Sequence, residues 1–295
     1  MKGGRRHLPD FLIIGAQKSG TTTLYADLEC QAAICMSSVK EPSVLVRFAE
    51  PEEAARYYGH LFEAQSSHRR FGEASTLYTQ IPTYSGIPER ARRILGPDLR
   101  LLYVLRNPVE RALSHHYHAY SRGRAGRDVD HAVRADPMFV DHGRYAMQLQ
   151  AWLDQFGRDA VLVRRFEDYV VDRAAAVRRV GEFLGVSVDP ARIQGEREFN
   201  KGGDQIAGYL RPIITSDFYK LWLRRAVPDG LRKRLFRLLA PRPPDRPAPP
   251  SLETIDYLIE RLRPDTEHLR QLIGPEAPTW DLEATRRKFA ERKSG

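Results

Sequence analysis

The stretch FLIIGAQKSGTTTL, at residues 11–24, carries the strongest structural signal in the chain. Phe11–Ile14 is a short continuous apolar run, which is typical of a strand buried on both faces of a parallel sheet. A loop bounded by Gly15 and Gly20 follows, and Leu24 then begins a helical pattern. Strand, glycine-bounded loop and helix in this order predict the opening of a nucleotide-binding α/β unit.

Beyond this stretch, further short apolar runs alternate with helical patterns. The strands expected from these runs are Ile34–Met36, Arg70–Ser75, Leu101–Leu105 and Val161–Val163. Gly185 is placed to stop a helix, and a second amphipathic helix covers 252–262. The alternation predicts an α/β fold with a central parallel sheet flanked by helices.

The rest of the chain is assigned to loops and to one domain. Residues 122–142, which are rich in arginine and glycine at their start, are interpreted as a mobile loop. The Pro-rich segment 241–250 is interpreted as an extended connector. It is too short to argue an independent second domain, so a single domain over 1–295 is expected. Its core covers about 10–210, and 211–295 form a helical C-terminal elaboration.

Composition excludes some classes of protein but does not identify a ligand. The 295 residues are 42% hydrophobic, which excludes a disordered chain, and the net charge of +9 favours an anionic partner. Two cysteines, Cys30 and Cys35, make no disulfide framework and are expected as small reduced residues. The chain has no stretch of the roughly 18 apolar residues that a membrane span requires. We expect a cytoplasmic protein without stable membrane insertion.

The glycine loop has the spacing of a phosphate-binding loop but a different cation. A nucleoside-triphosphatase loop puts lysine directly after the second glycine, where this chain has Thr21. Its lysine, Lys18, lies inside the loop instead. The clearest strand ends at Arg106, where a magnesium-dependent enzyme would carry an aspartate. These residues predict a phosphate site without a metal.

At this point the sequence resembles a known family, the sulfotransferases that use 3′-phosphoadenylyl sulfate (PAPS). The stretch 17–24 (QKSGTTTL) resembles their 5′-phosphosulfate loop, and 106–114 (RNPVERALS) resembles their 3′-phosphate motif. Lys40-Glu41-Pro42 resembles a Lys-Glu pair of the carbohydrate, heparan-sulfate-like branch and its bacterial relatives. The stretch 200–203 (NKGG) resembles the late loop that closes over the donor.

The resemblance implies a P-loop-like fold, PAPS as donor, adenosine 3′,5′-bisphosphate as product, and no metal. Lys18 would neutralise the departing 5′-phosphate, and Arg106 would bind the 3′-phosphate. The implied donor-binding residues are Lys18, Ser19, Gly20, Thr21, Thr22, Thr23, Arg106, Ser114, Lys201, Gly202 and Gly203. Plainer alternatives remain open: helix capping for the threonines, a surface ion pair for Arg106, and a flexible turn for 201–203.

Transfer to a hydroxyl requires a base near the acceptor, and Glu41 is the first candidate. Pro42 disfavours helix at Glu41, which places this carboxylate on a loop near Lys18. The resemblance supports the same role, although a solvated carboxylate is the alternative. Glu73 is the second candidate, with a structural hydrogen-bonding role as its alternative. Its neighbour is Ala74, where eukaryotic carbohydrate enzymes often carry lysine.

The remaining candidates are less specific. His115, His116 and His118 follow the Arg106 motif and are expected mainly in packing, at the surface or in acceptor contacts. Basic amphipathic segments at 221–225 and 231–239 cap an acceptor cleft, contact an anionic lipid or glycan, or form a solvated helix face, which is the favoured interpretation. Two rival functions remain: a nucleotide-dependent kinase and a non-catalytic nucleic-acid-binding protein. The favoured partner is a carbohydrate or small natural-product acceptor and not nucleic acid, while the oligomeric state is left open.

Overall fold

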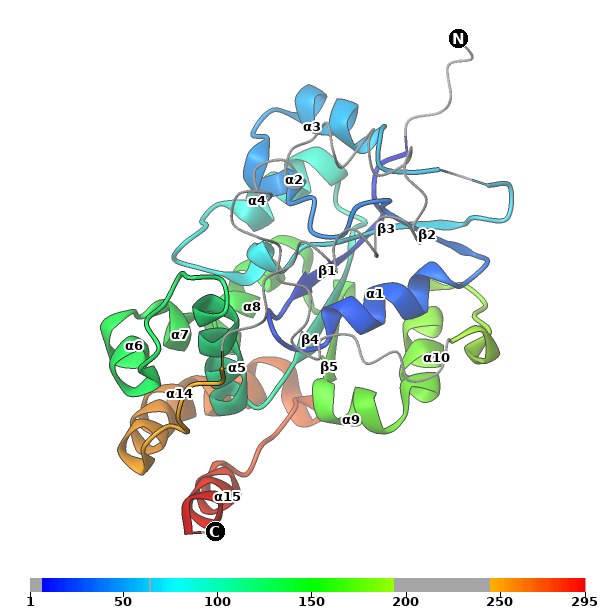
Figure 1. The fold of residues 1–295 in the computed structure, drawn as a ribbon. Helices are drawn as coiled ribbons and strands as arrows, with labels where there is room; N and C mark the ends of the chain where they lie inside the picture. Colours follow the sequence, from blue (N-terminus) through cyan, green and yellow to red (C-terminus); the bar gives the residue numbers. More distant parts are fainter. Residues whose placement is uncertain (1–6, 64, 194–244, 295) are drawn as a thin grey trace.

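Five parallel strands form the centre of the structure, which is a computed structural model that describes residues 7–63, 65–193 and 245–294 (Figure 1). The strands lie in the order β2-β3-β1-β4-β5. Their bounds are β1 (Phe11–Gly15), β2 (Ile34–Met36), β3 (Arg70–Ala74), β4 (Arg100–Leu105) and β5 (Val161–Arg165). The α/β fold with a parallel sheet is therefore confirmed, and each expected strand is present.

Strand β1 lies inside the sheet and explains why its sequence is a continuous apolar run. Leu12 pairs with Glu73 of β3 on one side and with Leu101 of β4 on the other. All residues of β1 are buried. Parallel strands covered on both faces need apolar side chains on both faces.

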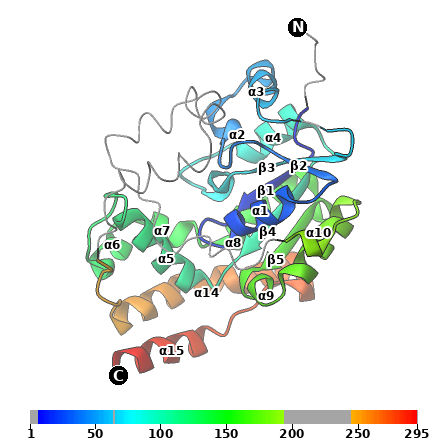
Figure 2. The same ribbon diagram turned by 45° about the vertical axis from the view of Figure 1, so that its right-hand side comes forward.

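Two helical layers cover the sheet (Figures 1 and 2). Phe11 and Ile13 of β1 belong to a buried cluster that contains Leu28 and Val177. This layer consists of α1 (Thr21–Glu29), α9 (Phe166–Val171) and α10 (Arg173–Leu184). Leu12 and Ile14 belong to the cluster on the opposite face. That layer contains α2 (Val44–Arg47), α3 (Pro51–Tyr58), α4 (Ile87–Leu95) and α8 (Tyr145–Phe156).

A third group of helices has a smaller core of its own beside the sheet. It consists of α5 (Pro108–Tyr120), α6 (Val129–Ala135), α7 (Met138–Asp141), α14 (Leu252–Ile273) and α15 (Leu282–Ser294). In Figure 2, α15 runs alongside α14 at the bottom of the view. This arrangement brings the C-terminal helices to the helix that follows β4.

The prediction of a mobile loop over 122–142 is wrong from residue 129 onward. Helices α6 and α7 lie there, and their apolar residues Val133 and Phe139 are buried against α5 and α14. The Asp128 carboxylate accepts hydrogen bonds from the amides of Asp130 and His131 and so caps α6. A side-chain cap and buried apolar residues are what a short helix needs to be stable.

Other details of the local sequence are confirmed. Pro108 begins α5, and Gly185 ends α10 with a φ of 67°. Cys30 and Cys35 are free thiols. Residues 245–250 of the Pro-rich segment have no regular secondary structure, while 241–244 lie outside the described residues. The single domain over 1–295 stays a prediction.

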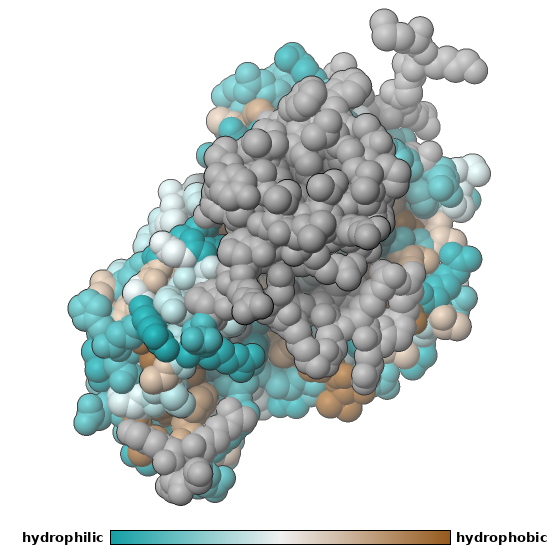
Figure 3. All heavy atoms as spheres, viewed as in Figure 1, coloured by the Kyte–Doolittle hydropathy of each residue, from teal (hydrophilic) through white to brown (hydrophobic). Residues whose placement is uncertain are grey.

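Hydrophilic residues cover much of the described surface on the face shown in Figure 3, and hydrophobic residues are scattered among them. The large apolar side chains that stand exposed in the described part of the chain are Val170 and Val171, at the end of α9. In that part of the chain, no helix combines the length and apolarity needed to cross a bilayer.

The cap of α6 gives a test of the corrected segment. Asp128→Ala removes the acceptor for two amides in the first turn of α6, so the free energy of unfolding should fall by about 1 kcal/mol. Denaturant unfolding measures this change. Asp98→Ala, at an exposed turn residue, is the matched control and should change stability by less than about 0.5 kcal/mol. Equal effects of the two substitutions would contradict the cap.

Candidate active site

The predicted site residues gather beyond the carboxyl ends of the strands. Lys18 follows β1, Glu41 follows β2, and Arg106 follows β4. Since all pairs are parallel, these ends meet at one edge of the sheet. The chain order also reverses at β1, because β2 and β3 lie on one side of it and β4 and β5 on the other. Crevices at such positions are the usual ligand sites of open α/β sheets.

The loop between β1 and α1 has the conformation of an anion-binding turn. Gly20 precedes α1 with a φ of 80°, and α1 has no side-chain cap. A Cβ atom on Gly20 would lie 2.6 Å from Cε2 of Phe166, so only glycine fits against this ring. Gly20, and not a threonine, is the N-cap residue of α1, which does not fit the capping alternative for the threonines. The Thr23 amide donates to the carbonyl oxygen of Gly20 at 3.0 Å, and the amides of Thr21 and Thr22 have no intrahelical acceptor. Thr21 is buried, while Thr22 and Thr23 are half-buried.

Lys18 lies among cations. Burial, followed by the nearby charges of Arg122, Arg106 and Lys40, lowers its pKa from 10.5 to about 8. Among the residues that the structure describes, no carboxylate lies within ion-pairing distance of Lys18. Like charges that are brought together favour binding of an anion.

Arg106 lies beside the same loop, and only some of its hydrogen-bond donors have partners among the described residues. Its guanidinium stacks 5.3 Å from the centroid of the Phe166 ring and pairs with Glu110 at 3.0 Å. Its Nε is buried, and no described residue accepts a hydrogen bond from it. Arg106 does form the ion pair of the plainer alternative, but it retains a donor for a further ligand. Ser114 lies two turns along α5, partly buried.

The Glu41 carboxylate is held by contacts from two strand ends. Lys40 Nζ lies 2.6 Å from Glu41 Oε1, and the amide of Thr76 donates to Oε2 at 3.0 Å. The backbone amide of Glu41 donates to the carbonyl oxygen of Ala74 at 2.9 Å. The side chain is 35% exposed, so these contacts fix it at the sheet edge and leave it accessible.

Glu73 is fully buried. The hydroxyl groups of Tyr58, Ser75 and Tyr78 each donate to its carboxylate at 2.6 Å. Burial raises its pKa despite these hydrogen bonds, and the nearby Glu41 charge raises it further. Both oxygens are thus occupied within the core, which favours the structural role that the sequence left open for Glu73.

The histidines divide into packed and peripheral side chains. His115 is buried and stacks on His142 at 5.6 Å, and burial together with the Arg111 charge lowers its pKa to about 2. The His116 ring hydrogen-bonds to the carbonyl oxygen of Gly126 at 2.9 Å. His118 contacts Arg122 and lies close enough to Lys18 for burial and that charge to lower its pKa to about 3. His118 therefore lies at the site, beside Arg122 and Lys18.

Several site contacts were not predicted. Arg122, placed in a mobile loop by the sequence, lies near Lys18. Its spacing of four residues from His118, one helical turn, was an available signal. Thr285 and Lys288 of α15 contact the residues that follow β4, and nothing local in the sequence indicates this. Lys201, Gly202, Gly203 and both basic segments within 221–239 lie outside the described residues.

Comparison with known proteins identifies the family. The model of the sulfotransferase domain matches residues 8–200, so this chain belongs to the sulfotransferase family, as its motifs predicted. The solved sulfotransferase from Alicyclobacillus acidocaldarius has the same fold. That structure has a TM-score of 0.62 and 24% identity over 95% of this chain and 99% of its own.

Curated relatives are larger proteins. Heparan sulfate glucosamine 3-O-sulfotransferase 6 of Homo sapiens is 32% identical over 194 residues, which are 62% of this chain and 54% of the relative. The human bifunctional heparan sulfate N-deacetylase/N-sulfotransferase 2 is 24% identical over 297 residues, which are 92% of this chain and 31% of the relative. The chain therefore spans about half the length of the first of these relatives and less of the second.

A metal site has no support in the described part of the chain, which contains no group of three or more His, Cys, Asp or Glu side chains arranged to hold an ion. The site consists instead of cations, amides and one accessible carboxylate. It can bind a multiply charged anion and can accept a proton beside it.

The environment of Lys18 predicts unusual reactivity. With a pKa of about 8, against 10.5 as its ordinary value, about half of its amine is neutral at pH 8. An acylating reagent should therefore modify Lys18 in the native protein with a midpoint near pH 8, as measured by mass spectrometry of the labelled peptide. The unfolded protein is the control and should show the ordinary midpoint. Inorganic phosphate should raise the native midpoint, because an anion favours the charged amine. A native midpoint equal to that of the unfolded chain would contradict the cation cluster.

Proposed function

We propose that this chain transfers a sulfuryl group from PAPS to a hydroxyl of a carbohydrate or small natural-product acceptor. The observation that carries the proposal is the cation cluster of Lys18 and Arg106 at the start of α1, with Glu41 held at the same sheet edge. Such a cluster fits a donor with phosphate at two positions. Membership of the sulfotransferase family supports the reaction class.

Different residues are assigned to the two phosphate positions of the donor. The loop Ser19–Thr23 and the first turn of α1 bind the 5′-phosphate with amides and hydroxyls, together with Lys18. Arg106 binds the 3′-phosphate through the donor groups that its ion pair leaves available, and Ser114 lies on the helix behind it. Lys201, Gly202 and Gly203 are assigned to the donor by the motif alone.

In the proposed transfer, Glu41 accepts the proton of the acceptor hydroxyl while the oxygen of that hydroxyl attacks sulfur. The bond between sulfur and the bridging oxygen breaks, and the 5′-phosphate leaves with the electron pair. Lys18 stabilises this charge as it develops. Lys40 and the Thr76 amide keep the Glu41 carboxylate aimed at the sheet edge. No charge changes at the 3′-phosphate, so Arg106 contributes to binding and not to the chemical step.

For the acceptor, the proposal names a chemical class and not one molecule. The names of both relatives refer to heparan sulfate, which supports a sugar acceptor, and the name of the 3-O-sulfotransferase supports a hydroxyl of that sugar. A glycan acceptor also suits the accessible position of Glu41, which a buried base such as Glu73 would not offer. A screen of hydroxyl acceptors with labelled donor identifies the substrate.

Donor binding tests the proposal directly. Adenosine 3′,5′-bisphosphate without added metal should raise the melting temperature, because a ligand that binds only the folded state stabilises it by about 2.7 kcal/mol at a hundred times its Kd. ATP with magnesium should stabilise far less, and a DNA oligomer should not stabilise. Equal stabilisation by ATP, or dependence on magnesium, would overturn the assignment to PAPS.

The role of Glu41 is tested by Glu41→Gln. The amide keeps the size of the side chain but does not accept a proton, so kcat should fall by about 10²–10⁴-fold in steady-state assays with labelled donor. The Kd of the donor product should change little. Glu73→Gln is the parallel variant and should lose less activity per folded molecule, because its oxygens are occupied within the core. A Glu41→Gln enzyme within a few-fold of the parent would remove Glu41 from the mechanism.

A further inference from the structure

The Glu110 carboxylate lies between two cations from distant parts of the chain. Arg106, one helical turn before Glu110, places Nη2 3.0 Å from Oε2 of Glu110. Lys288 of α15 donates from Nζ to the other oxygen, Oε1, at 2.6 Å. The arginine assigned to the 3′-phosphate therefore shares one counter-ion with the C-terminal helix.

The contact between α15 and this carboxylate belongs to a built interface. The backbone amide of Asn107 donates to Glu167 Oε1 at 2.8 Å, and Trp280 Nε1 donates to Glu167 Oε2 at 3.1 Å. Asn107 Nδ2 donates to Thr285 Oγ1 at 2.8 Å. These bonds attach the segment before α15, and α15 itself, to the residue that follows Arg106.

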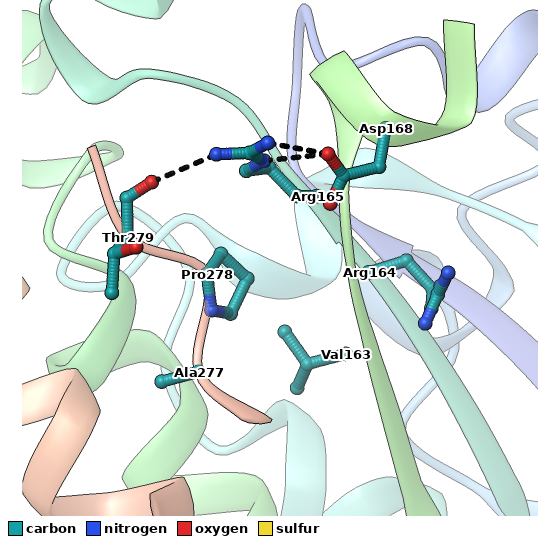
Figure 4. Close-up of a pocket in the computed structure, with 7 residues that line it drawn as sticks. All are labelled: Val163, Arg164, Arg165, Asp168, Ala277, Pro278 and Thr279. Carbon is teal, nitrogen blue, oxygen red and sulfur yellow. Dashed lines mark hydrogen bonds and ion pairs between the residues drawn. The ribbon is translucent and has the colours of Figure 1, made fainter. Parts of the chain in front are cut away.

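The segment before α15 has a second attachment at the end of β5. Figure 4 shows Arg165 between Thr279 and Asp168, at a recess that Pro278 also lines. Arg165 Nη1 donates to the carbonyl oxygen of Thr279 at 3.1 Å, and Nε donates to Asp168 at 3.0 Å. Fixed at both strand ends, α15 presents Lys288 to Glu110 in a defined position.

The position of Lys288 affects the charge balance between Glu110 and Arg106. Burial raises the pKa of Glu110, but hydrogen bonds from Lys288 and Arg106 outweigh burial and hold the pKa below its ordinary value. Glu110 is therefore an anion that competes with any phosphate for the Arg106 guanidinium. Lys288 offsets part of that charge and binds one of the two oxygens. Without Lys288, the carboxylate would be free to bind Arg106 through both oxygens, which is the stronger geometry.

We propose that Lys288 is a positioning residue for the 3′-phosphate of the donor: it holds Glu110 so that Arg106 remains available to the phosphate. The proposal rests on the proposed function, since it takes Arg106 as the 3′-phosphate ligand. Lys288 acts through Glu110, and α15 thereby sets how strongly the site distinguishes nucleotides with a 3′-phosphate from those without one.

The test is the ratio of two dissociation constants, for adenosine 3′,5′-bisphosphate and adenosine 5′-monophosphate, measured by calorimetry at low ionic strength. In Lys288→Gln the affinity for the bisphosphate should fall by about three- to five-fold, the scale of a partly exposed ion pair. The affinity for the monophosphate should stay unchanged. Lys288→Arg should retain the parent ratio. A Lys288→Gln protein with the parent ratio would overturn the proposal.

A double-mutant cycle separates this role from a direct or a merely structural one. In a Glu110→Gln background no carboxylate competes for Arg106, so adding Lys288→Gln should change the ratio much less than in the parent. An equal change in both backgrounds would overturn the proposal. Arg286→Gln is the matched control, because Arg286 lies in the same helix but pairs with Asp256 at 2.6 Å. It should leave the ratio unchanged.

Nucleotide binding by the parent protein distinguishes failure of the proposed function from failure of the role proposed for Lys288. A parent that binds both nucleotides equally would show that the site has no 3′-phosphate ligand, which defeats the proposed function and the proposal with it. A parent that prefers the bisphosphate, with a Lys288→Gln variant of the same preference, defeats only the role of Lys288.

Discussion

The pairing of β1 with β3 on one side and β4 on the other is the constraint on which the site depends. It places the Lys18 loop between the strand ends that carry Glu41 and Arg106. The amide of Ala16, at the start of the loop, donates to the carbonyl oxygen of Val104 at 2.7 Å, which fixes the loop to β4. The carboxylate therefore lies toward β2 and β3, and the guanidinium toward β4. An anion at the loop meets a proton acceptor on one flank and a second cation on the other.

The carboxylates around this loop are each held by specific partners. Glu41 is held by Lys40 and Thr76, Glu110 by Arg106 and Lys288, and Glu73 by buried hydroxyl groups. Negative charge near a phosphate site weakens binding unless it is offset or kept at a distance. Of these three carboxylates, only Glu41 is both accessible and at the sheet edge shared with Lys18, which supports the role proposed for it.

Local sequence patterns predicted the elements whose causes are local. Apolar runs gave the strands, and Gly185 marked the end of α10 because a left-handed residue there suits glycine. Because the strands are parallel, Lys18, Glu41 and Arg106, which each follow a strand, lie at the same edge of the sheet, as predicted. The helices within 122–142 were not predicted because the arginine- and glycine-rich start outweighed the helical spacing of Val129, Ala132 and Val133.

Contacts between distant segments were beyond the reach of these patterns. Glu110 and Lys288 are 178 positions apart, and neither has a neighbour in sequence that indicates the other. The burial of Glu73 likewise depends on Tyr58 and Tyr78, which come from a helix and a 3₁₀ turn on different sides of β3 in the sequence. Tertiary packing decided both, so the same residue type is a candidate base at Glu41 and a structural group at Glu73.

The cation cluster has a cost that an anion offsets. Burial and the charges of Arg122, Arg106 and Lys40 disfavour the charged form of Lys18, so the site without an anion stores unfavourable energy. Binding of a phosphate offsets this repulsion, since the anion attracts each of these cations. Residues that destabilise the free protein while they favour a ligand are characteristic of functional sites. The strain is electrostatic here, and it is concentrated at the lysine that meets the leaving phosphate in the proposed transfer.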